Sequence, residues 1–157
     1  GVGSFDYAIK KLDESGMRKN IEDLVIDKKI PILGVCVGMQ MLARSSEEGK
    51  LKGLGWIDAI VKRFDATNDI ILPHMGWNNV NPRSYDGLYK NTKKDLKFYF
   101  LHEYYFDAYE ESEVEATANY KGEYACSVRK GNIFGVQFHP EKSHHFGMQL
   151  LKNFAEI

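Results

Sequence analysis

The run Ile30-Pro31-Ile32-Leu33-Gly34-Val35-Cys36-Val37-Gly38-Met39-Gln40 decides the fold of this 157-residue chain. Residues 30–35 form a short, nearly unbroken apolar segment, which is typical of a strand buried on both faces. Residues 39–43 predict a helix that begins directly afterwards. We therefore expect Cys36 at a tight turn between a buried strand and a helix.

The turn itself has the form G-x-C-x-G, the cysteine analogue of a nucleophile elbow, which lifts a reactive atom clear of a sheet. Side chains at Gly34 and Gly38 are expected to collide with neighbouring elements. Free N–H groups at the start of the helix should stabilise a thiolate at Cys36, and the N–H of Val37 should donate to an oxyanion. The same string also fits a buried cysteine that only packs a helix against a strand.

A second candidate group is His139, which follows the apolar strand predicted over residues 133–138. In extended chain, residues i and i+2 point to the same side, so Glu141 can hold the His139 ring and fix its tautomer. Pro140 donates no backbone hydrogen bond, and sheet pairing should stop there. A strand end with a solvated carboxylate would give the same string.

The remaining histidines and the second cysteine predict no metal or cofactor. His144 and His145 are adjacent, so on a helix they point about 100° apart, which is poor geometry for one metal ion. We expect His74 and His102 to be held by backbone partners. Cys126 lies in a strand-like run without flanking glycines, which indicates a core residue.

Composition limits the class of protein. Hydrophobic residues make up 43% and charged residues 27% of the chain, and 21 basic against 22 acidic residues give a net charge of -1. This balance excludes the basic surface of a nucleic-acid or anionic-membrane binder. No apolar run is long enough for a transmembrane helix, and the start has no signal-peptide pattern. We therefore expect a single domain over residues 1–157 in the cytoplasm, with both thiols free.

Periodicity predicts three further helices. Ser4 should cap the first, over residues 5–12, and Gly16 should end it. Residues 17–25 carry a second helical stripe, and Phe146, Leu150, Leu151 and Phe154 should share the buried face of a closing helix.

Strands are predicted where β-branched and aromatic residues cluster, and the polar segment 78–97 is expected to be a loop. A buried strand, helices and these additional strands predict an α/β fold with antiparallel strands in the second half. The predicted strands are residues 57–64, 69–72, 98–106, 113–120, 124–129 and 133–138.

The order Cys36, His139, Glu141 and seven sequence strings resemble the class I glutamine amidotransferases. The strings follow the family's order and cover nearly the whole chain. The resemblance implies a flavodoxin-like mixed sheet flanked by helices, without the β-α-β-α-β stretch that opens the family's domain, about 40–50 residues. The strings are GVGSF (1–5), GVCVGMQ (34–40), SSEEG (45–49), GLG (53–55), PHMGWN (73–78), FLHEYYF (100–106) and GVQFHPEKS (135–143).

The resemblance also implies roles for individual residues. Cys36 would be the nucleophile, His139 the general acid and base, and Glu141 its orienting group. The positions matching the family's substrate site are Gly1, Val2, Gly3, Val37, Gly38, Gln40, Glu48, His102, Glu103 and Tyr104. Glu103 stands where the family usually has serine, and its carboxylate would repel a substrate carboxylate unless it points away. Positions near a partner subunit are Met75, Trp77, Asn78, Tyr99 and Lys142.

The implied activity is hydrolysis of L-glutamine to glutamate and ammonia through a cysteine thioester. The ammonia would pass to a (β/α)8-barrel cyclase in a heterodimer, forming imidazole glycerol phosphate and AICAR in histidine biosynthesis. One alternative is a paralogous subunit that supplies ammonia for amidino-sugar synthesis in surface polysaccharides. Others are a γ-glutamyl hydrolase or peptidase of the same fold and a non-catalytic interaction subunit.

Overall fold

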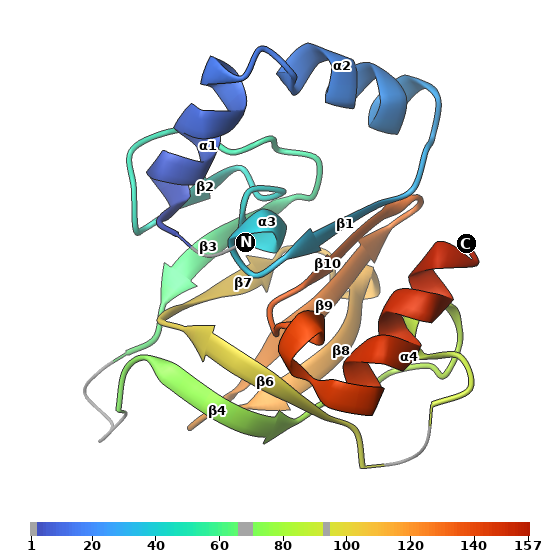
Figure 1. The fold of residues 1–157 in the computed structure, drawn as a ribbon. Helices are drawn as coiled ribbons and strands as arrows, with labels where there is room; N and C mark the ends of the chain where they lie inside the picture. The colour runs from blue at the N-terminus through green and yellow to red at the C-terminus, as the bar shows by residue number, and fades with distance from the viewer. Residues whose placement is uncertain (1–2, 66–70, 93–94) are drawn as a thin grey trace.

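The computed structural model describes residues 3–65, 71–92 and 95–157 (Figure 1). The α-helices are α1 Phe5–Glu14, α2 Arg18–Glu22, α3 Val37–Gln40 and α4 His144–Ala155. The π-helix η1 spans Asp23–Asp27, and the 3-10 helices are η2 Gly87–Tyr89, η3 Glu111–Glu113 and η4 Pro140–Lys142. The strands are β1 Ile32–Val35, β2 Ser45–Ser46, β3 Ala59–Arg63, β4 His74–Asn79, β5 Asn81–Pro82, β6 Lys97–His102, β7 Tyr104–Ala108, β8 Val114–Asn119, β9 Glu123–Lys130 and β10 Ile133–Val136.

A mixed sheet forms the centre of the described structure, in the order β1-β10-β9-β7-β3-β2, with β8 paired to β9 and β5 to β8. The pairs β1–β10 and β2–β3 are parallel, whereas the pairs of the second half are antiparallel. A separate pair, β4–β6, lies beside this sheet, and Figure 1 shows α1 and α2 at the top of the molecule, β4 and β6 at the bottom and α4 at the right-hand side. The architecture confirms the predicted mixed α/β class. Among the described residues, no helix has the length and apolar character needed to span a membrane.

The first helix is confirmed, and Gly16 follows its end with φ 69°, a left-handed conformation that favours glycine. Ser4 occupies the predicted N-cap position, but its side chain makes no capping hydrogen bond. The backbone N–H of Phe5 instead donates to the carboxylate of Glu48 at 2.8 Å. A distant acidic residue therefore satisfies one of the free N–H groups at the start of α1.

Two helix predictions need correction. The helix after the cysteine begins at Val37, two residues earlier than predicted. On α4, Leu150 is fully buried but Leu151 is 40% exposed, so Leu151 is not on the buried face. Gly147 is buried there in its place, because α4 packs closely on Pro140.

Two strand predictions and one loop prediction also differ from the structure. The segment 98–106 is broken at Glu103 into β6 and β7, which belong to different sheets. The expected loop 78–97 contains the end of β4, β5 and η2, because pairing with β6 holds residues 78–79 extended and pairing with β8 holds β5 extended. Of the strand predicted at 69–72, residues 71–72 are not in a strand, and residues 69–70 lie outside the described part.

The parallel pair β1–β10 positions the candidate site. Val35 lies in register with Val136, so the segments that follow the two strands leave the sheet at the same edge. Cys36 begins one of these segments and His139 lies in the other. The ring of Phe98 on β6 stacks on Phe138 at 4.0 Å between centroids, and both side chains are fully buried. This packing fixes β6 against the segment that leads to His139.

Candidate active site

Cys36 occupies a strained backbone position between β1 and α3, with φ 53° and ψ -113°. Such a conformation costs a non-glycine residue about 1–3 kcal/mol and persists only where the surroundings enforce it. Its N–H donates to the carbonyl of Val136 at 2.8 Å, which anchors the turn to β10. A Cβ at Gly34 would lie 2.6 Å from the carbonyl oxygen of Gly38, which explains the first glycine. The expectation for Gly38 is wrong, because a Cβ there meets nothing within 4 Å.

The Cys36 sulfur is buried, with 6% of the residue exposed. The Gln137 amide donates to Sγ at 3.8 Å, and the Leu101 carbonyl oxygen lies 3.9 Å from it. Burial raises the pKa of the Cys36 thiol, and hydrogen bonds from the Val37 N–H and from Gln137 offset only part of this. The Val37 N–H thus favours the thiolate in the predicted direction, but burial outweighs its effect on the pKa. Helix α3 has only four residues, so its dipole is small.

His139 is fully buried, and its Nδ1 lies 2.7 Å from Oε1 of Glu141. Because a carboxylate only accepts, Nδ1 carries the proton and Nε2 of the neutral ring is an acceptor. Nε2 is buried and has no hydrogen-bond partner among the described residues. Burial opposes ionisation of Glu141, but hydrogen bonds from His139 and from its own N–H lower its pKa below the usual value. The pair thus presents an unsatisfied base in the protein interior.

Strand β6 brings Cys36 and His139 to one place. The N–H of His139 donates to the carbonyl of Tyr99 at 2.8 Å, and the Cys36 sulfur lies against the carbonyl of Leu101. Tyr99 and Leu101 are two residues apart on one strand, a distance of about 7 Å. The Cys36 sulfur and the backbone of His139 therefore contact the same short stretch of β6.

Ser143 was missed by the sequence analysis, although it ends the GVQFHPEKS string. It is fully buried, and its hydroxyl donates to the His139 carbonyl at 2.6 Å and accepts the Tyr99 N–H at 3.0 Å. One side chain thereby clamps His139 to β6. A Cβ at Gly147 would strike the carbonyl oxygen of Pro140, so α4 approaches this segment as closely as only glycine allows.

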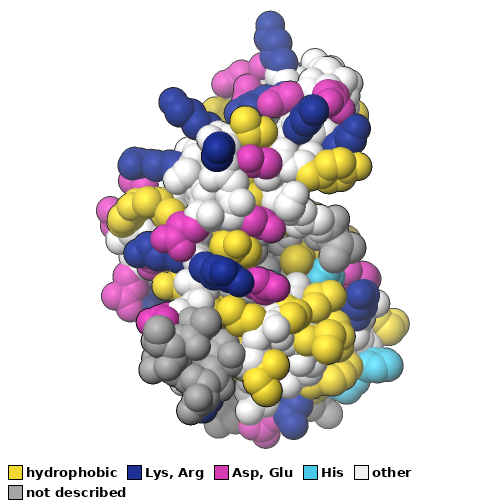
Figure 2. Space-filling view, turned by 90° about the vertical axis from the view of Figure 1, so that its left-hand side faces the viewer, with side chains coloured by type: hydrophobic (Ala, Val, Ile, Leu, Met, Phe, Trp, Pro, Cys, Tyr) yellow, Lys and Arg dark blue, Asp and Glu magenta, His cyan; other side chains and the backbone are white. Residues whose placement is uncertain are grey.

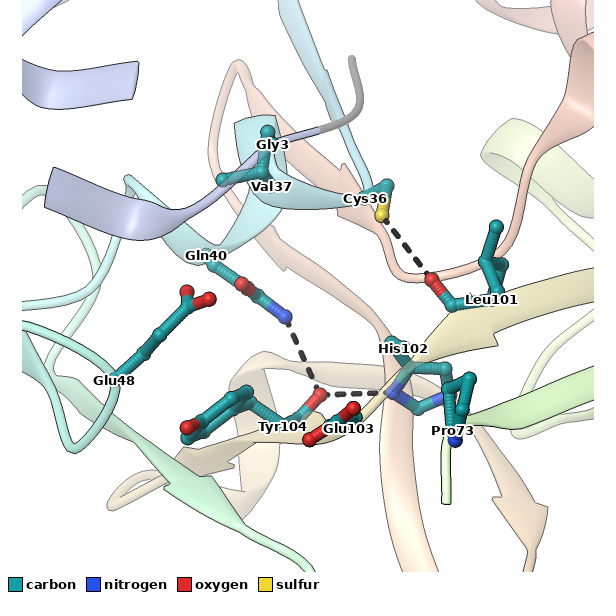
Figure 3. Close-up of a pocket in the computed structure, with 10 residues that line it drawn as sticks. All are labelled: Gly3, Cys36, Val37, Gln40, Glu48, Pro73, Leu101, His102, Glu103 and Tyr104. Atoms are coloured by element: carbon teal, nitrogen blue, oxygen red, sulfur yellow. Dashed lines mark hydrogen bonds between the residues drawn. The ribbon is translucent and has the colours of Figure 1, made fainter. Parts of the chain in front are cut away.

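A cavity of about 300 Å³ opens beside the cysteine (Figure 3). It contains seven of the predicted substrate-site residues. Gly38 does not line it, and Gly1 and Val2 lie outside the described residues. Pro73 and Leu101 line it but carry no sequence signal of their own. The lining residues are Gly3, Cys36, Val37, Gln40, Glu48, Pro73, Leu101, His102, Glu103 and Tyr104.

Two polar side chains of the cavity are already tied to the protein. Gln40 donates through Nε2 to the Tyr104 carbonyl at 3.2 Å (Figure 3) and to Oε1 of Gln137 at 3.1 Å. Both of its N–H groups are therefore used, and only its oxygen can accept from a ligand. The Glu48 carboxylate lines the cavity while it holds the N–H of Phe5.

The expected repulsion by Glu103 is reduced by a neighbour. Its carboxylate pairs with Arg63 at 3.2 Å, and the two side chains are 39% and 57% exposed. The pair is solvent-screened, so it neutralises the charge at the rim without a large contribution to stability.

His74 and His102 form a buried pair behind the cavity. His102 Nδ1 bonds the Tyr104 carbonyl at 2.8 Å as predicted, whereas His74 is held by side chains: Nδ1 lies 3.0 Å from His102 Nε2, and Nε2 lies 3.3 Å from the Asn78 amide. Burial lowers the pKa of His74 to about 4 and that of His102 to about 3, so both rings are neutral near pH 7. Among the described residues, no group of His, Cys, Asp or Glu is arranged to hold a metal ion.

The outward face of β4 carries exposed apolar residues, Met75 at 65% and Trp77 at 47% exposure. Figure 2 shows hydrophobic side chains gathered with a histidine on the lower part of this face. The His144 ring stacks on Trp77 at 5.4 Å, and Lys142 lies over the Tyr99 ring at 5.8 Å. Asn78 is not part of this patch. It is half-buried and its amide donates to the Asn119 carbonyl at 2.8 Å.

A cysteine raised on a strand-to-helix turn, with a buried imidazole bonded to an exposed carboxylate in the segment after the neighbouring parallel strand, is the arrangement of an α/β protein of the cysteine-dependent amidase class. Comparison with protein families makes the assignment specific. The model of the family "Glutamine amidotransferase class-I" matches residues 10–157, and the chain belongs to this family.

Two relatives are similar in sequence over the whole length of this chain. It is 53% identical to the imidazole glycerol phosphate synthase subunit HisH of Bdellovibrio bacteriovorus and 54% identical to that of Leptospira interrogans, covering 100% of this chain and 78% of each relative. Solved structures share the fold at lower identity. A glutamine amidotransferase structure matches with a TM-score of 0.68 at 19% identity, covering 93% of this chain and 72% of the other. A glutamine amidotransferase from Thermotoga maritima matches with a TM-score of 0.63 at 20% identity, covering 99% of this chain and 60% of the other.

Proposed function

We propose that this chain is a glutaminase subunit that hydrolyses L-glutamine and delivers ammonia to a synthase partner in histidine biosynthesis. The observation that carries the proposal is the buried Nε2 of His139, which has no hydrogen-bond partner among the described residues and belongs to a segment whose backbone pairs with the strand that the Cys36 sulfur contacts. A buried acceptor without a partner is costly, and a cysteine thiol or a substrate N–H would satisfy it. Family membership and the name shared by the similar proteins support glutamine as the substrate.

The reaction begins with proton transfer from the Cys36 thiol to Nε2 of His139, which Glu141 stabilises as an imidazolium ion. The thiolate attacks the side-chain carboxamide carbon of glutamine, and the Val37 N–H stabilises the oxyanion. His139 returns the proton to the leaving nitrogen, the C–N bond breaks and ammonia departs. A water molecule, deprotonated by His139, then cleaves the thioester, releasing glutamate and restoring the thiol.

The cavity suits the rest of the substrate. We propose that the Glu48 carboxylate pairs with the α-ammonium group and that the Gln40 oxygen accepts from it, because both side chains line the cavity. The backbone of residues 102–104 is proposed to contact the α-carboxylate, while Arg63 neutralises the nearby Glu103 side chain. These residue roles rest on the cavity lining and on the matching family positions.

Ammonia needs a partner, because only its unprotonated form is nucleophilic and water near neutral pH protonates it. A closed route to a second active site avoids this loss. The exposed Met75 and Trp77, with Tyr99 and Lys142 beside them, form the surface that we propose to meet a (β/α)8-barrel cyclase. An apolar patch of this kind on a small protein is typical of an interaction site.

The test measures glutamate release from L-glutamine by the purified chain, alone and with a barrel-type cyclase and its ligand. We expect slow hydrolysis alone, stimulation by the partner, and loss of both after Cys36→Ala. Unchanged turnover in that variant would contradict the proposal. Preferential release of glutamate from γ-glutamyl peptides would indicate a hydrolase, and co-purification with a sugar-modifying enzyme would move the ammonia acceptor to the amidino-sugar pathway.

A further inference from the structure

The proposed mechanism leaves unused a buried amide that lies against the reactive sulfur, Gln137. This residue is fully buried, and its backbone N–H donates to the Cys126 carbonyl at 2.9 Å. Its side-chain nitrogen lies 3.8 Å from the Cys36 sulfur, within hydrogen-bond range for sulfur. An amide is costly to bury unless its polar atoms make hydrogen bonds. The partners of the Gln137 amide therefore indicate why it lies beside the sulfur.

The orientation of the Gln137 amide is fixed by a second glutamine. Gln40 Nε2 faces two acceptors, the Tyr104 carbonyl at 3.2 Å and Gln137 Oε1 at 3.1 Å. An amide nitrogen only donates and an amide oxygen only accepts, so this arrangement allows one orientation of each side chain. The oxygen of Gln137 is held by Gln40, and its nitrogen is consequently turned toward the sulfur.

The chain of bonds continues behind the cavity. The Tyr104 carbonyl also accepts from His102 Nδ1 at 2.8 Å, and His102 Nε2 accepts from His74 Nδ1 at 3.0 Å. The Tyr124 hydroxyl lies 3.3 Å from each of these two ring nitrogens. Each link is buried or half-buried, so the Gln40 amide cannot turn without breaking bonds that water would not replace.

We propose that Gln137 is a positioning residue that holds the Cys36 sulfur for acylation and donates to its thiolate, and that Gln40 acts through Gln137. The inference rests on the proposed glutaminase function, because it assigns a further residue to that site. A hydrogen bond to a charged acceptor is stronger than one to a neutral acceptor, so the Gln137 N–H favours the thiolate over the thiol. Removing this donor makes the nucleophile harder to form and leaves the substrate contacts in place.

The test is the pH dependence of Cys36 alkylation by iodoacetamide, read by intact mass and peptide mapping. Gln137→Met keeps the length of the side chain and removes the donor. We expect its alkylation at pH 7–8 to be about tenfold slower than in the unaltered chain, and the two rates to converge at high pH, where the thiol is fully ionised. Gln137→Glu should slow it further, because a carboxylate replaces the donor. The Cys36→Ser variant gives the background from Cys126.

Gln149 provides a matched control, since its amide bonds Asn153 on α4. Gln149→Met should leave the alkylation profile unchanged. Gln40→Met keeps the Gln137 donor but no longer fixes its orientation, and should produce a smaller shift in the same direction. It also serves as the deciding variant if Gln137→Met does not fold.

Turnover separates this inference from the proposed function. Absence of glutamine hydrolysis by the unaltered protein with its partner would refute the glutaminase proposal. The alkylation profiles would still show whether Gln137 favours the Cys36 thiolate. With hydrolysis present, Gln137→Met should lower kcat about tenfold with little change in KM. A folded Gln137→Met protein with the unaltered alkylation profile and kcat would overturn the inference.

Discussion

The buried pair His74 and His102 makes the stability of the fold depend on pH in a way that can be worked out. Burial lowers the pKa of His74 from 6.5 to about 4 and that of His102 from 6.5 to about 3. Between these values and 6.5 the unfolded chain binds more protons than the folded one, so stability rises with pH. The pair carries no destabilising cost well above pH 6.5, and the cost grows as the pH falls through 6.5 toward 4 for His74 and toward 3 for His102.

The magnitude follows from the same values. The ordinary histidine pKa is 6.5, so pH 5 lies 1.5 units below it. At this pH a histidine of the unfolded chain is protonated, whereas the two folded rings stay neutral. At 1.36 kcal/mol per unit, each ring therefore lowers the free energy of unfolding by about 2 kcal/mol, and the pair by about 4 kcal/mol.

The assay is urea unfolding followed by tryptophan fluorescence at pH 5 and pH 8. The quantity compared is the change in unfolding free energy between the two pH values. His74→Gln and His102→Gln should each remove about half of the histidine contribution, and the double variant nearly all of it, whatever other groups titrate. His145→Gln, on an exposed residue, is the control and should not alter the change. A double variant with the same pH dependence as the unaltered chain would refute the reasoning.

Three further predictions follow from single contacts. Gly147→Ala should lower the unfolding free energy by about 1–3 kcal/mol in urea titrations, because its Cβ meets the Pro140 carbonyl; an unchanged midpoint would show that α4 moves aside freely. Glu103→Ser should lower KM for glutamine about twofold to fivefold at low salt by freeing Arg63, and a rise in KM would contradict this. Glu141→Gln should reduce kcat about 10³-fold while the protein stays folded, since the histidine it bonds loses its orienting charge; activity near that of the unaltered enzyme would contradict this.

Local patterns in the sequence were enough to predict the central elements. The apolar run before Cys36 gave β1, and the string around His139 gave the end of β10 with the Glu141 contact. The physical reasons differ in part from the predicted ones. Strand β1 is mostly half-buried and not buried on both faces, and Glu141 reaches His139 from the 3-10 helix η4 and not from extended chain. The break at Glu103 was not predictable in this way, because residues on both sides of it favour strands and only the separation of two sheets ends β6 there.

In the candidate active site, too, some features could be predicted from the sequence and others depend on contacts between distant residues. The family resemblance indicated most of the cavity residues, but the bonds between Gln40, Gln137 and Cys36 join residues about 100 positions apart in sequence. The raised pKa of Cys36 also depends on burial by β6, which no motif encodes. Ser143 clamps His139 through contacts that become visible only when β6 and the final segment are placed together.

The most direct test of the account is acid quenching during turnover of L-glutamine, followed by intact-mass measurement and peptide mapping. The account predicts that a γ-glutamyl adduct accumulates on Cys36 of the unaltered chain in the presence of its partner. It also predicts that the adduct is absent from Cys36→Ser. An adduct on another residue, or glutamine hydrolysis that continues in Cys36→Ser, would contradict the central claim that the thiol at position 36 is acylated by an amide.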